Sequence, residues 1–353
     1  MTEATVVIGD RRIGSEDPPF VIAEAGANHD GDLDRAKRLI DAAATANADA
    51  IKFQNYTAEK LVTKSAPKYW GDRETTQYET FAKLDCLVPD DYREMARYAR
   101  KEGLIYLSTP FDRGAVNLLA DLQVPAYKIA SGDLTHHPLL EYVAAQGEPV
   151  VLSTGMATLE EIRAAVSVIE STGNEDIVLL HCVTEYPTPV EEANLRMMRT
   201  LDDEFDYPVG LSDHTMGTTV PTAAAALGAA VIEKHFTFDT TLQKSPDHRL
   251  SADTDEMAEI VDRTRDAHAA LGRSEQGPTD RESEGLAKAR RSLVTGRAFQ
   301  AGEAITTDGL AVKRPGTGIA PQEYWTAGEE TWRAVTDLAA DRVLTWDDIE
   351  RDE

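Results

Sequence analysis

Eight short β-rich runs, each followed by a helical pattern, constrain the fold of this chain more than any other feature. Eight strand-then-helix units over roughly 250 residues match a (β/α)8 (TIM) barrel in both count and length. A doubly wound open sheet is the alternative, but the GxGxxG fingerprint that normally follows its first strand is absent. We therefore predict an α/β fold built as a barrel. The predicted strands are Phe20–Ala23, Ala50–Phe53, Ile105–Leu107, Ala126–Ile129, Val150–Leu152, Ile177–His181, Val209–Leu211 and Val231–Glu233. The predicted helices are Leu33–Thr45, Asp90–Glu102, Arg113–Leu122, Pro138–Ala145, Leu159–Ser171, Asn194–Leu201, Thr219–Leu227 and Thr254–Leu271.

The two ends of the chain depart from this alternation. Residues 4–13 alternate around a Gly-Asp pair and predict a short hairpin before the barrel. Residues 273–290 are charged and poor in large apolar side chains, which is typical of a linker. Residues 291–353 consist of short β-rich runs and Gly- or Pro-containing turns, a module of about 60 residues near the lower size for folding alone. We expect a barrel domain over residues 1–272, and a small β-rich domain whose apolar face is covered by the barrel or by a neighbouring subunit.

The charge balance is strongly acidic, with 36 Lys and Arg against 62 Asp and Glu and a formal net charge of −26. Nucleic-acid binding requires a basic surface, so this balance argues against it. The acids are spread over helical segments, as on the surfaces of proteins that work at high salt, where self-repulsion is screened. Stability that does not depend on KCl concentration would contradict this interpretation of the acidic surface.

The sequence also bears on compartment and on cysteine chemistry. No apolar run is long enough to span a bilayer, and the first residues lack a signal-peptide core, so we expect a cytoplasmic protein without a membrane partner. Cys86 and Cys182 are far apart and suggest neither a disulfide framework nor a zinc knuckle. Cys182 lies in the apolar run IVLLHCV, which predicts a core residue.

Polar residues gather at the carboxyl ends of the predicted strands, where barrels carry their chemistry. Strand ends that served packing alone would not collect so many polar groups on one side. The asymmetry favours an enzyme over a binding scaffold. The residues are Glu24, Asn28 and His29; Lys52 and Gln54; Ser108 and Thr109; Lys128 and Ser131; Ser153 and Thr154; His181, Thr184 and Tyr186; Ser212, Asp213 and His214; and Glu233, Lys234 and His235.

Two histidines among these residues predict a metal site. His214 and His235 end neighbouring predicted strands, so both imidazoles could meet above the sheet. Two imidazoles placed in this way can hold a divalent metal and leave coordination positions for water or substrate. The alternative is that each histidine is a satisfied polar residue at a strand end. Because both lie within polar clusters, the metal site is the better interpretation.

Lysines at three strand ends predict an anion site. Lys52, Lys128 and Lys234, with Ser and Thr donors nearby, would bind a phosphate or a carboxylate. A Schiff-base aldolase is a different use of such a lysine, and spacing alone does not exclude it. Each lysine could also be structural.

Three further residues are candidates. Glu24 lies in the apolar run FVIAEAG and is either a carboxylate satisfied by the lysines or a general acid/base with a tuned pKa. Asp247 follows a proline, and could bind sugar hydroxyls or a metal-bound water, or be a turn residue. Arg314 lies in the loop KRPGTG, which could aim its guanidinium at a substrate carboxylate, although such loops are also common surface turns.

These residues recur in ordered motifs along nearly the whole chain, which resembles the N-acetylneuraminate (sialic acid) synthase family. The motifs are IAEAGANHDGDLDRAKRLI, AIKFQ, LSTPFD, YKIASGD, VLSTGMAT, LLHCVTEYPTP, GLSDHT, AVIEKHFT, SPDHRLS, RRSLV and KRPGTGI. The C-terminal module resembles the antifreeze-like (SAF, β-clip) domain of that family.

The resemblance implies condensation of phosphoenolpyruvate with an open-chain N-acyl hexosamine. Phosphate would leave by C–O cleavage, and the product would be a 2-keto-3-deoxy nonulosonic acid. It implies Mn²⁺ or Mg²⁺ on His214 and His235, and Glu24 near the reacting carbons. It also implies a homodimer in which the SAF module carries Arg314 to the active site of the partner subunit. Phosphoenolpyruvate would be held by Lys52, Thr109, Lys128, Ser131 and Ser212, with Thr184 near it, and the sugar by Gln54, Tyr186 and Asp247.

Departures from the family pattern leave the sugar open. Thr184 replaces Asn, Asp133 replaces Glu, Thr135-His136 replaces an Asn pair, and Ser245 replaces Gly. The expected sugar is of the N-acetylmannosamine type. The alternatives are a 2,4-diacetamido-trideoxy hexose, which gives a legionaminic or pseudaminic acid, and the 6-phosphate, which gives a 9-phosphorylated product.

Other functions remain as alternatives. One is a phosphoenolpyruvate-condensing barrel of the octulosonate or heptulosonate phosphate type, which the SAF module and the two histidines disfavour. The others are the Schiff-base aldolase and a carbohydrate- or ice-binding protein, and the polar strand ends argue against the latter.

Overall fold

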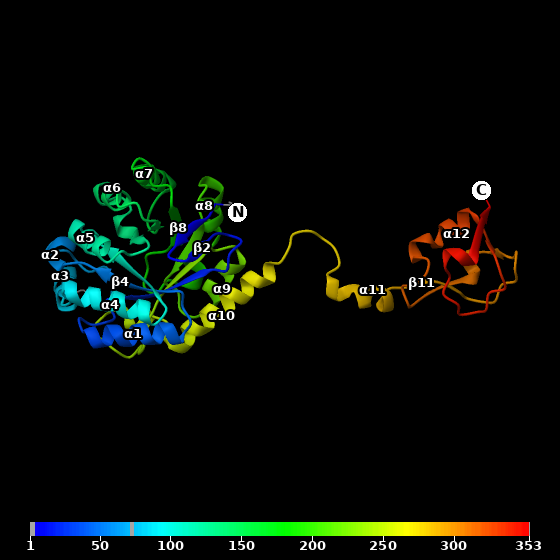
Figure 1. Ribbon diagram of the computed structural model, residues 1–353, viewed down its shortest axis with the longest axis horizontal. Helices are drawn as coiled ribbons and strands as arrows, with labels where there is room; N and C mark the ends of the chain where they lie inside the picture. The colour runs from blue at the N-terminus through cyan, green and yellow to red at the C-terminus, as the bar shows by residue number, and fades with distance from the viewer. Residues whose placement is uncertain (1–3, 71–73, 353) are drawn as a thin grey trace. The chain divides into compact units, whose positions relative to one another are not determined.

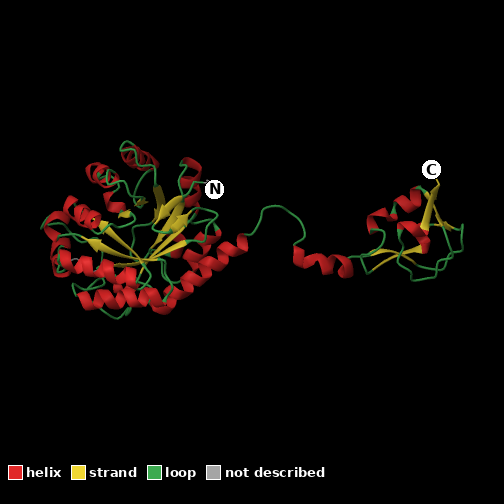
Figure 2. Cartoon of the chain, in the orientation of Figure 1, coloured by secondary structure: helices red, strands yellow, loops and turns green. Residues whose placement is uncertain are grey.

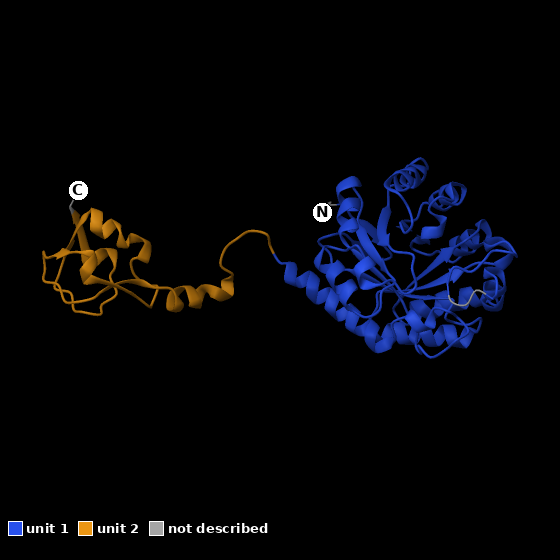
Figure 3. Cartoon of the chain, turned by 180° about the vertical axis from the view of Figure 1, so that it is seen from behind, with its two compact units in different colours: residues 1–272 blue, residues 273–353 orange. Residues whose placement is uncertain are grey.

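The computed structural model describes residues 4–70 and 74–352. The chain divides into two compact units, Met1–Gly272 and Arg273–Glu353 (Figure 3). Each unit has its own buried apolar core. No helix of the described ranges is long and apolar enough to cross a membrane.

The first unit is built on eight parallel strands that form a nearly closed barrel (Figures 1 and 2). The strands pair in the order β5-β4-β3-β10-β9-β8-β7-β6. The predicted barrel is therefore confirmed, because each predicted strand overlaps one of these eight strands. The strands are β3 (Phe20–Gly26), β4 (Ala50–Asn55), β5 (Ile105–Pro110), β6 (Tyr127–Ile129), β7 (Val150–Ser153), β8 (Ile177–Cys182), β9 (Val209–Asp213) and β10 (Val231–His235).

Helices surround the barrel, and several begin at residues that cap them (Figure 2). Asp112, Thr158 and Asp253 each accept a backbone N–H of the first turn, which fixes where the helix starts. Two short helices, α2 and α3, lie between β4 and α4 where no helix was predicted. The helices are α1 (Leu33–Thr45), α2 (Ala58–Leu61), α3 (Gln77–Leu84), α4 (Pro89–Lys101), α5 (Arg113–Asp121), α6 (His137–Ala144), α7 (Leu159–Glu170), α8 (Arg196–Glu204), α9 (Thr219–Ala226) and α10 (Thr254–Leu271).

Alternation along the strands separates two cores. Side chains of one parity, such as Val21 and Ile232, pack against the surrounding helices in a large apolar cluster. Side chains of the other parity, such as Phe20, Leu180 and Val231, fill the barrel interior. Near the carboxyl ends the interior parity becomes polar, and this change creates the site described below.

The N-terminal hairpin packs against the interior cluster. β1 (Val6–Ile8) and β2 (Arg11–Ile13) pair antiparallel, as predicted. Val6, Ile8 and Ile13 are buried and join the interior residues of the strands. The hairpin therefore extends the barrel core at the end opposite the polar strand ends.

The second unit contains short strands around a buried tryptophan. Trp332 is fully buried among Leu293, Phe299, Leu338 and Leu344. The segment expected as a linker is partly helical, since α11 (Ser283–Ala289) lies within it. The other elements are β11 (Ser292–Thr295), β12 (Ala304–Ile305), β13 (Leu310–Lys313), α12 (Thr326–Glu329), β14 (Thr331–Ala334) and β15 (Ile349–Asp352).

Candidate active site

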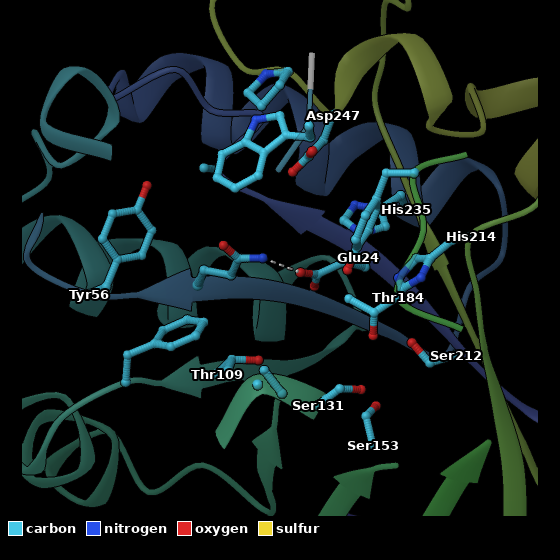
Figure 4. Close-up of a pocket in the computed structure, with 18 of the residues that line it drawn as sticks. Glu24, Tyr56, Thr109, Ser131, Ser153, Thr184, Ser212, His214, His235 and Asp247 are labelled. Carbon is cyan, nitrogen blue, oxygen red and sulfur yellow. Dashed lines mark hydrogen bonds between the residues drawn. The ribbon is translucent and has the colours of Figure 1, made fainter. Parts of the chain in front are cut away.

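A pocket of about 530 Å³ lies at the carboxyl ends of the barrel strands (Figure 4). It is lined by the interior-parity side chains that continue the barrel core. Arg314 belongs to the second unit, where it is exposed in the loop after β13. The predicted residues that line the pocket are Glu24, Lys52, Gln54, Thr109, Lys128, Ser131, Thr184, Tyr186, Ser212, His214, His235 and Asp247.

Two buried lysines and two buried glutamates form the floor of the pocket. Lys52 Nζ lies 2.7 Å from Glu24 Oε2 and 3.6 Å from Glu233 Oε2. It also donates to Thr109 Oγ1 at 3.0 Å. Lys128 Nζ lies 3.4 Å from Glu233 Oε1, so Glu233 stands between the two lysines. These four charges come from β3, β4, β6 and β10, and only the closed barrel brings them together.

Burial and pairing tune the charges of this floor. Burial raises the pKa of Glu24, and the attraction of Lys52 does not offset it. Burial also opposes ionisation of Glu233, but Lys128 and Lys52 outweigh it and lower the pKa of Glu233 to about 2. Burial lowers the pKa of Lys128. Glu233 is therefore the permanent anion of the floor, and Glu24 is the carboxyl group best able to carry a proton.

Hydroxyl groups form a cradle beside the lysines. Ser153 Oγ and Thr184 Oγ1 are buried and have no hydrogen-bond partner within the described part of the chain. Ser131 Oγ accepts the backbone N–H of Gly155 at 3.0 Å. A Cβ atom on Gly155 would lie 2.5 Å from Thr184 Oγ1 and 2.8 Å from Ser131 Oγ. Unpartnered donors next to ammonium groups are suited to an anion such as a phosphate or a carboxylate.

The two predicted metal ligands lie together. The ring centroids of His214 and His235 are 5.3 Å apart, and Figure 4 shows both rings beside Glu24. The Nδ1 atom of His235 is buried without a partner, and burial and the nearby His214 lower the pKa of His235 well below its usual value. His214 Nδ1 lies 2.6 Å from the Val183 carbonyl, so the neutral tautomer keeps a lone pair on Nε2.

This donor set fits a divalent metal held by two imidazoles. Two imidazoles would leave the remaining coordination positions to water and substrate. In the described ranges no group of three or more His, Cys, Asp or Glu side chains is placed to hold a metal ion. Burial alone lowers the pKa of His214, but Cys182 and the Val183 carbonyl outweigh it and raise the pKa. A proton therefore competes with a metal at His214, and metal affinity should fall as the pH falls.

The outer part of the pocket is aromatic on one side and carries a carboxyl group. Burial, reinforced by the charge of Glu24, raises the pKa of Asp247 to about 6. Tyr56 and Phe81 pack edge to face at 5.4 Å, and Trp70 lies 5.8 Å from Phe81. These aromatic side chains come from the segment that contains α2 and α3, which the sequence pattern did not reveal. An apolar wall facing a carboxyl group suits a sugar that carries acyl groups.

The prediction for Lys234 is wrong. Its side chain is 1% exposed and its Nζ pairs with Asp213 Oδ2 at 2.7 Å, away from the pocket. Lys234 has the outward parity of β10, whereas Glu233 and His235 have the inward parity. His181 is likewise outward and bonds the Ala193 carbonyl at 2.8 Å.

The same alternation identifies pocket residues to which the sequence analysis gave no role. Glu233 and Ser153, noted there only as polar strand-end residues, have inward parity and line the pocket. Cys182, expected in the core, is buried but also lines the pocket, with its Sγ atom 3.9 Å from His214 Nδ1. Each of these three residues lies two positions after an apolar residue of the barrel interior, namely Val151, Leu180 or Val231. The period of two along a strand therefore predicts that all three point inward.

Comparisons with known proteins identify the family of this chain. Residues 39–276 match the NeuB family, and residues 290–350 match the SAF domain. The chain is 44% identical to an uncharacterized protein of Methanocaldococcus jannaschii, with 98% of both chains covered. It is 41% identical to the N,N'-diacetyllegionaminic acid synthase of Legionella pneumophila, with 96% of both covered. A solved N-acetylneuraminic acid (sialic acid) synthetase of Leptospira borgpetersenii superposes with a TM-score of 0.74 at 36% identity, covering 81% of this chain and 96% of that one.

The barrel, the SAF domain and these relatives define a class, the phosphoenolpyruvate-condensing synthases of sialic acid-type nonulosonic acids. The chain belongs to the NeuB family. The resemblance seen in the sequence motifs is confirmed.

Proposed function

We propose that this enzyme condenses phosphoenolpyruvate with an N-acyl hexosamine of the N-acetylmannosamine type, giving a sialic acid-type acid and phosphate. The observation that carries the proposal is that the buried ammonium groups of Lys52 and Lys128 share one pocket with the unpartnered hydroxyls of Ser153 and Thr184. Lys52, Thr109, Lys128, Ser131, Thr184 and Ser212 would hold the phosphate and carboxylate groups of phosphoenolpyruvate. Gln54, Tyr186 and Asp247 would hold the sugar.

The chemistry forms one carbon–carbon bond and breaks one carbon–oxygen bond. C3 of phosphoenolpyruvate bonds to the aldehyde carbon of the sugar, and the aldehyde oxygen takes up a proton. Water adds to C2 and loses one proton, and cleavage of the bond between C2 and the phosphate oxygen then releases phosphate, which takes up the remaining hydroxyl proton and leaves the 2-keto acid. Glu24, whose pKa is raised by burial, would carry a proton beside the reacting carbons. His214 and His235 would hold Mn²⁺ or Mg²⁺, which polarises the aldehyde when bound.

A second candidate sugar is a 2,4-diacetamido-trideoxy hexose. Two observations favour it: the likeness to a legionaminic acid synthase, and the aromatic wall of Tyr56, Trp70 and Phe81. An apolar wall suits a second acetamido group and a deoxy carbon better than it suits a phosphate.

Phosphate release from phosphoenolpyruvate tests both candidates. The assay uses Mn²⁺ at low and high KCl with N-acetylmannosamine, its 6-phosphate, a 2,4-diacetamido hexose and arabinose 5-phosphate. Release with one N-acyl hexosamine, stopped by EDTA, is the expected result. Release only with arabinose 5-phosphate would assign the chain a different condensation, and borohydride trapping of pyruvate would indicate an aldolase.

Gly155 offers a test of the hydroxyl cradle. Gly155→Ala should raise the KM for phosphoenolpyruvate about tenfold or more, because a hydrogen bond to a charged group is worth roughly 1.5–3 kcal/mol. The new Cβ atom would displace the hydroxyls of Thr184 and Ser131. Gly132→Ala is the matched control, since Gly132 lines the pocket and a Cβ atom added there would meet nothing within 4 Å. Equal KM values for the two variants would contradict the cradle.

We also propose that Arg314 serves the active site of the partner subunit in a homodimer. The exposed position of Arg314 in the loop after β13 of the SAF domain, where its guanidinium is free to reach a substrate carboxylate, supports this proposal. Arg314→Ala and Glu24→Ala chains should each be inactive alone and regain partial activity when mixed. No recovery despite subunit exchange, shown by mass spectrometry of labelled chains, would favour a self-contained site.

A further inference from the structure

Asp30 lies outside the pocket lining, yet it ties two loops of the barrel together. It lies in the turn between β3 and α1, and its side chain is 2% exposed. Its Oδ1 atom accepts the backbone N–H of Ser245 at 2.9 Å and faces His248 Nε2 at 3.4 Å. Its Oδ2 atom pairs with Arg35. A buried carboxylate must be satisfied by protein groups, and two of the groups that satisfy Asp30 belong to the loop of Ser245 and His248. These contacts indicate that Asp30 fixes that loop.

The same turn holds that loop at a second point. Asn28 donates to Ser251 Oγ at 3.1 Å, and Ser251 Oγ donates to the Asp247 carbonyl at 2.7 Å. Asp247 therefore lies between two ties, one through Ser245 and His248 and one through Ser251. The loop 239–250 between β10 and α10 contains one short 3-10 turn, His248–Leu250, so these side-chain ties replace the regular hydrogen bonds it lacks.

We infer that Asp30 is a positioning residue that holds Asp247 at the sugar end of the pocket. This inference rests on the proposed function, in which Asp247 binds the sugar. An Asp30→Asn side chain has one acceptor oxygen and an NH2 group, but it faces the Ser245 N–H on one side and Arg35 on the other. One of the two contacts is therefore lost together with the negative charge, and the loop can leave the conformation that places Asp247. Asp30 acts on the sugar through Asp247 and does not reach the lysines that hold phosphoenolpyruvate, so its removal should affect one substrate and not the other.

Asp49 is a matched control for Asp30. Its side chain is 4% exposed, pairs with Arg265 at 3.2 Å and with Arg11, and accepts the backbone N–H of Val21 at 2.8 Å. It directly precedes β4, at the end of the barrel opposite the pocket. Asp49→Asn thus removes an equally buried, arginine-paired carboxylate without touching the loop 239–250.

The test compares Asp30→Asn, Asp49→Asn, Asp247→Asn and the double variant of Asp30 and Asp247. Asp30→Asn should raise the KM for the N-acyl hexosamine about tenfold. This is the lower end of the roughly 10- to 100-fold losses seen when a partner that orients a site residue is removed. The KM for phosphoenolpyruvate should stay within about twofold of the wild-type value. The double variant should be no worse than Asp247→Asn alone, because a residue that acts through Asp247 is not additive with it.

Limited trypsin digestion gives a readout that does not depend on activity. Lys244 and Arg249 are exposed in the loop, and Asp30→Asn should speed cleavage after both while Asp49→Asn should not. Ser251→Ala cuts the other tie and should show the same pattern if Asp30→Asn does not fold. Unchanged cleavage, or equal effects on both KM values, would overturn the inference. If the wild-type chain releases no phosphate with any sugar, the proposed function fails, and digestion still decides whether Asp30 holds the loop.

Discussion

The His235→Ala variant is expected to lose phosphate release from phosphoenolpyruvate by at least about 10²-fold, the scale on which removal of one electrostatic group in an active site acts. His235 has a buried Nδ1 atom without a partner and a pKa held well below its usual value, so it is a neutral donor at the pH of the assay. Alanine removes one of the two imidazoles that would hold the metal. Mn²⁺ binding, followed by electron paramagnetic resonance, should weaken together with activity.

His181→Gln is the control for this variant. His181 is also a buried histidine at a strand end, but its Nε2 atom bonds the Ala193 carbonyl and it does not line the pocket. Its loss should leave Mn²⁺ binding unchanged. A His235→Ala enzyme that still shows metal-stimulated turnover at the wild-type rate would contradict the metal assignment.

The Glu233→Gln variant is expected to be strongly destabilised as well as inactive. Breaking a buried ion pair by removing one partner costs about 3–5 kcal/mol, because the remaining charge is left uncompensated. Here two lysines, Lys52 and Lys128, would lose their shared carboxylate. Urea unfolding of the barrel, followed by circular dichroism, measures the loss. Glu204→Gln, which removes a carboxylate from a surface pair with Arg163, should change the midpoint little.

The pH dependence of stability gives a second readout for Glu233. Its folded-state pKa is lowered from 4.5 to about 2, so its ion pairs stabilise the fold above the unfolded pKa. This contribution should disappear progressively as the pH falls from 4.5 toward 2. The Glu233→Gln variant has no carboxylate to protonate at this position, so its free energy of unfolding should fall less than that of the wild type over this pH range. Parallel pH profiles for the wild type and the variant would contradict a paired, ionised Glu233.

The barrel could be predicted from the sequence because its strands are buried on both faces. Runs such as Val150–Leu152 and Ile177–His181 are short and apolar, and the helices between them have apolar residues at helical spacing. The predicted strands therefore agree with the structure to within one to three residues at their ends. Helices α2 and α3 were missed because short helices within a long loop have little periodicity to detect.

The metal and substrate candidates of the barrel could be found for a similar reason. Polar residues at the carboxyl ends of strands contrast with the apolar runs before them, as at Lys52 and Ser212. The prediction was wrong where residues that point into the barrel had to be distinguished from residues that point toward the surrounding helices. Lys234 points outward to Asp213, while its neighbours Glu233 and His235 point into the pocket.

The sequence by itself determined the eight barrel strands, the helices that follow them, the order of the domains and the family. Those properties depend on local patterns of apolar and polar residues, and on motifs read along the chain. Only the tertiary structure decided that Glu233 lies between Lys52 and Lys128, and that Asp30 holds the loop of Ser245. These contacts join residues that are up to 215 positions apart, through barrel closure and strand register. The pKa values of the site follow from that closure, because burial and the distances between charges exist only in the folded barrel.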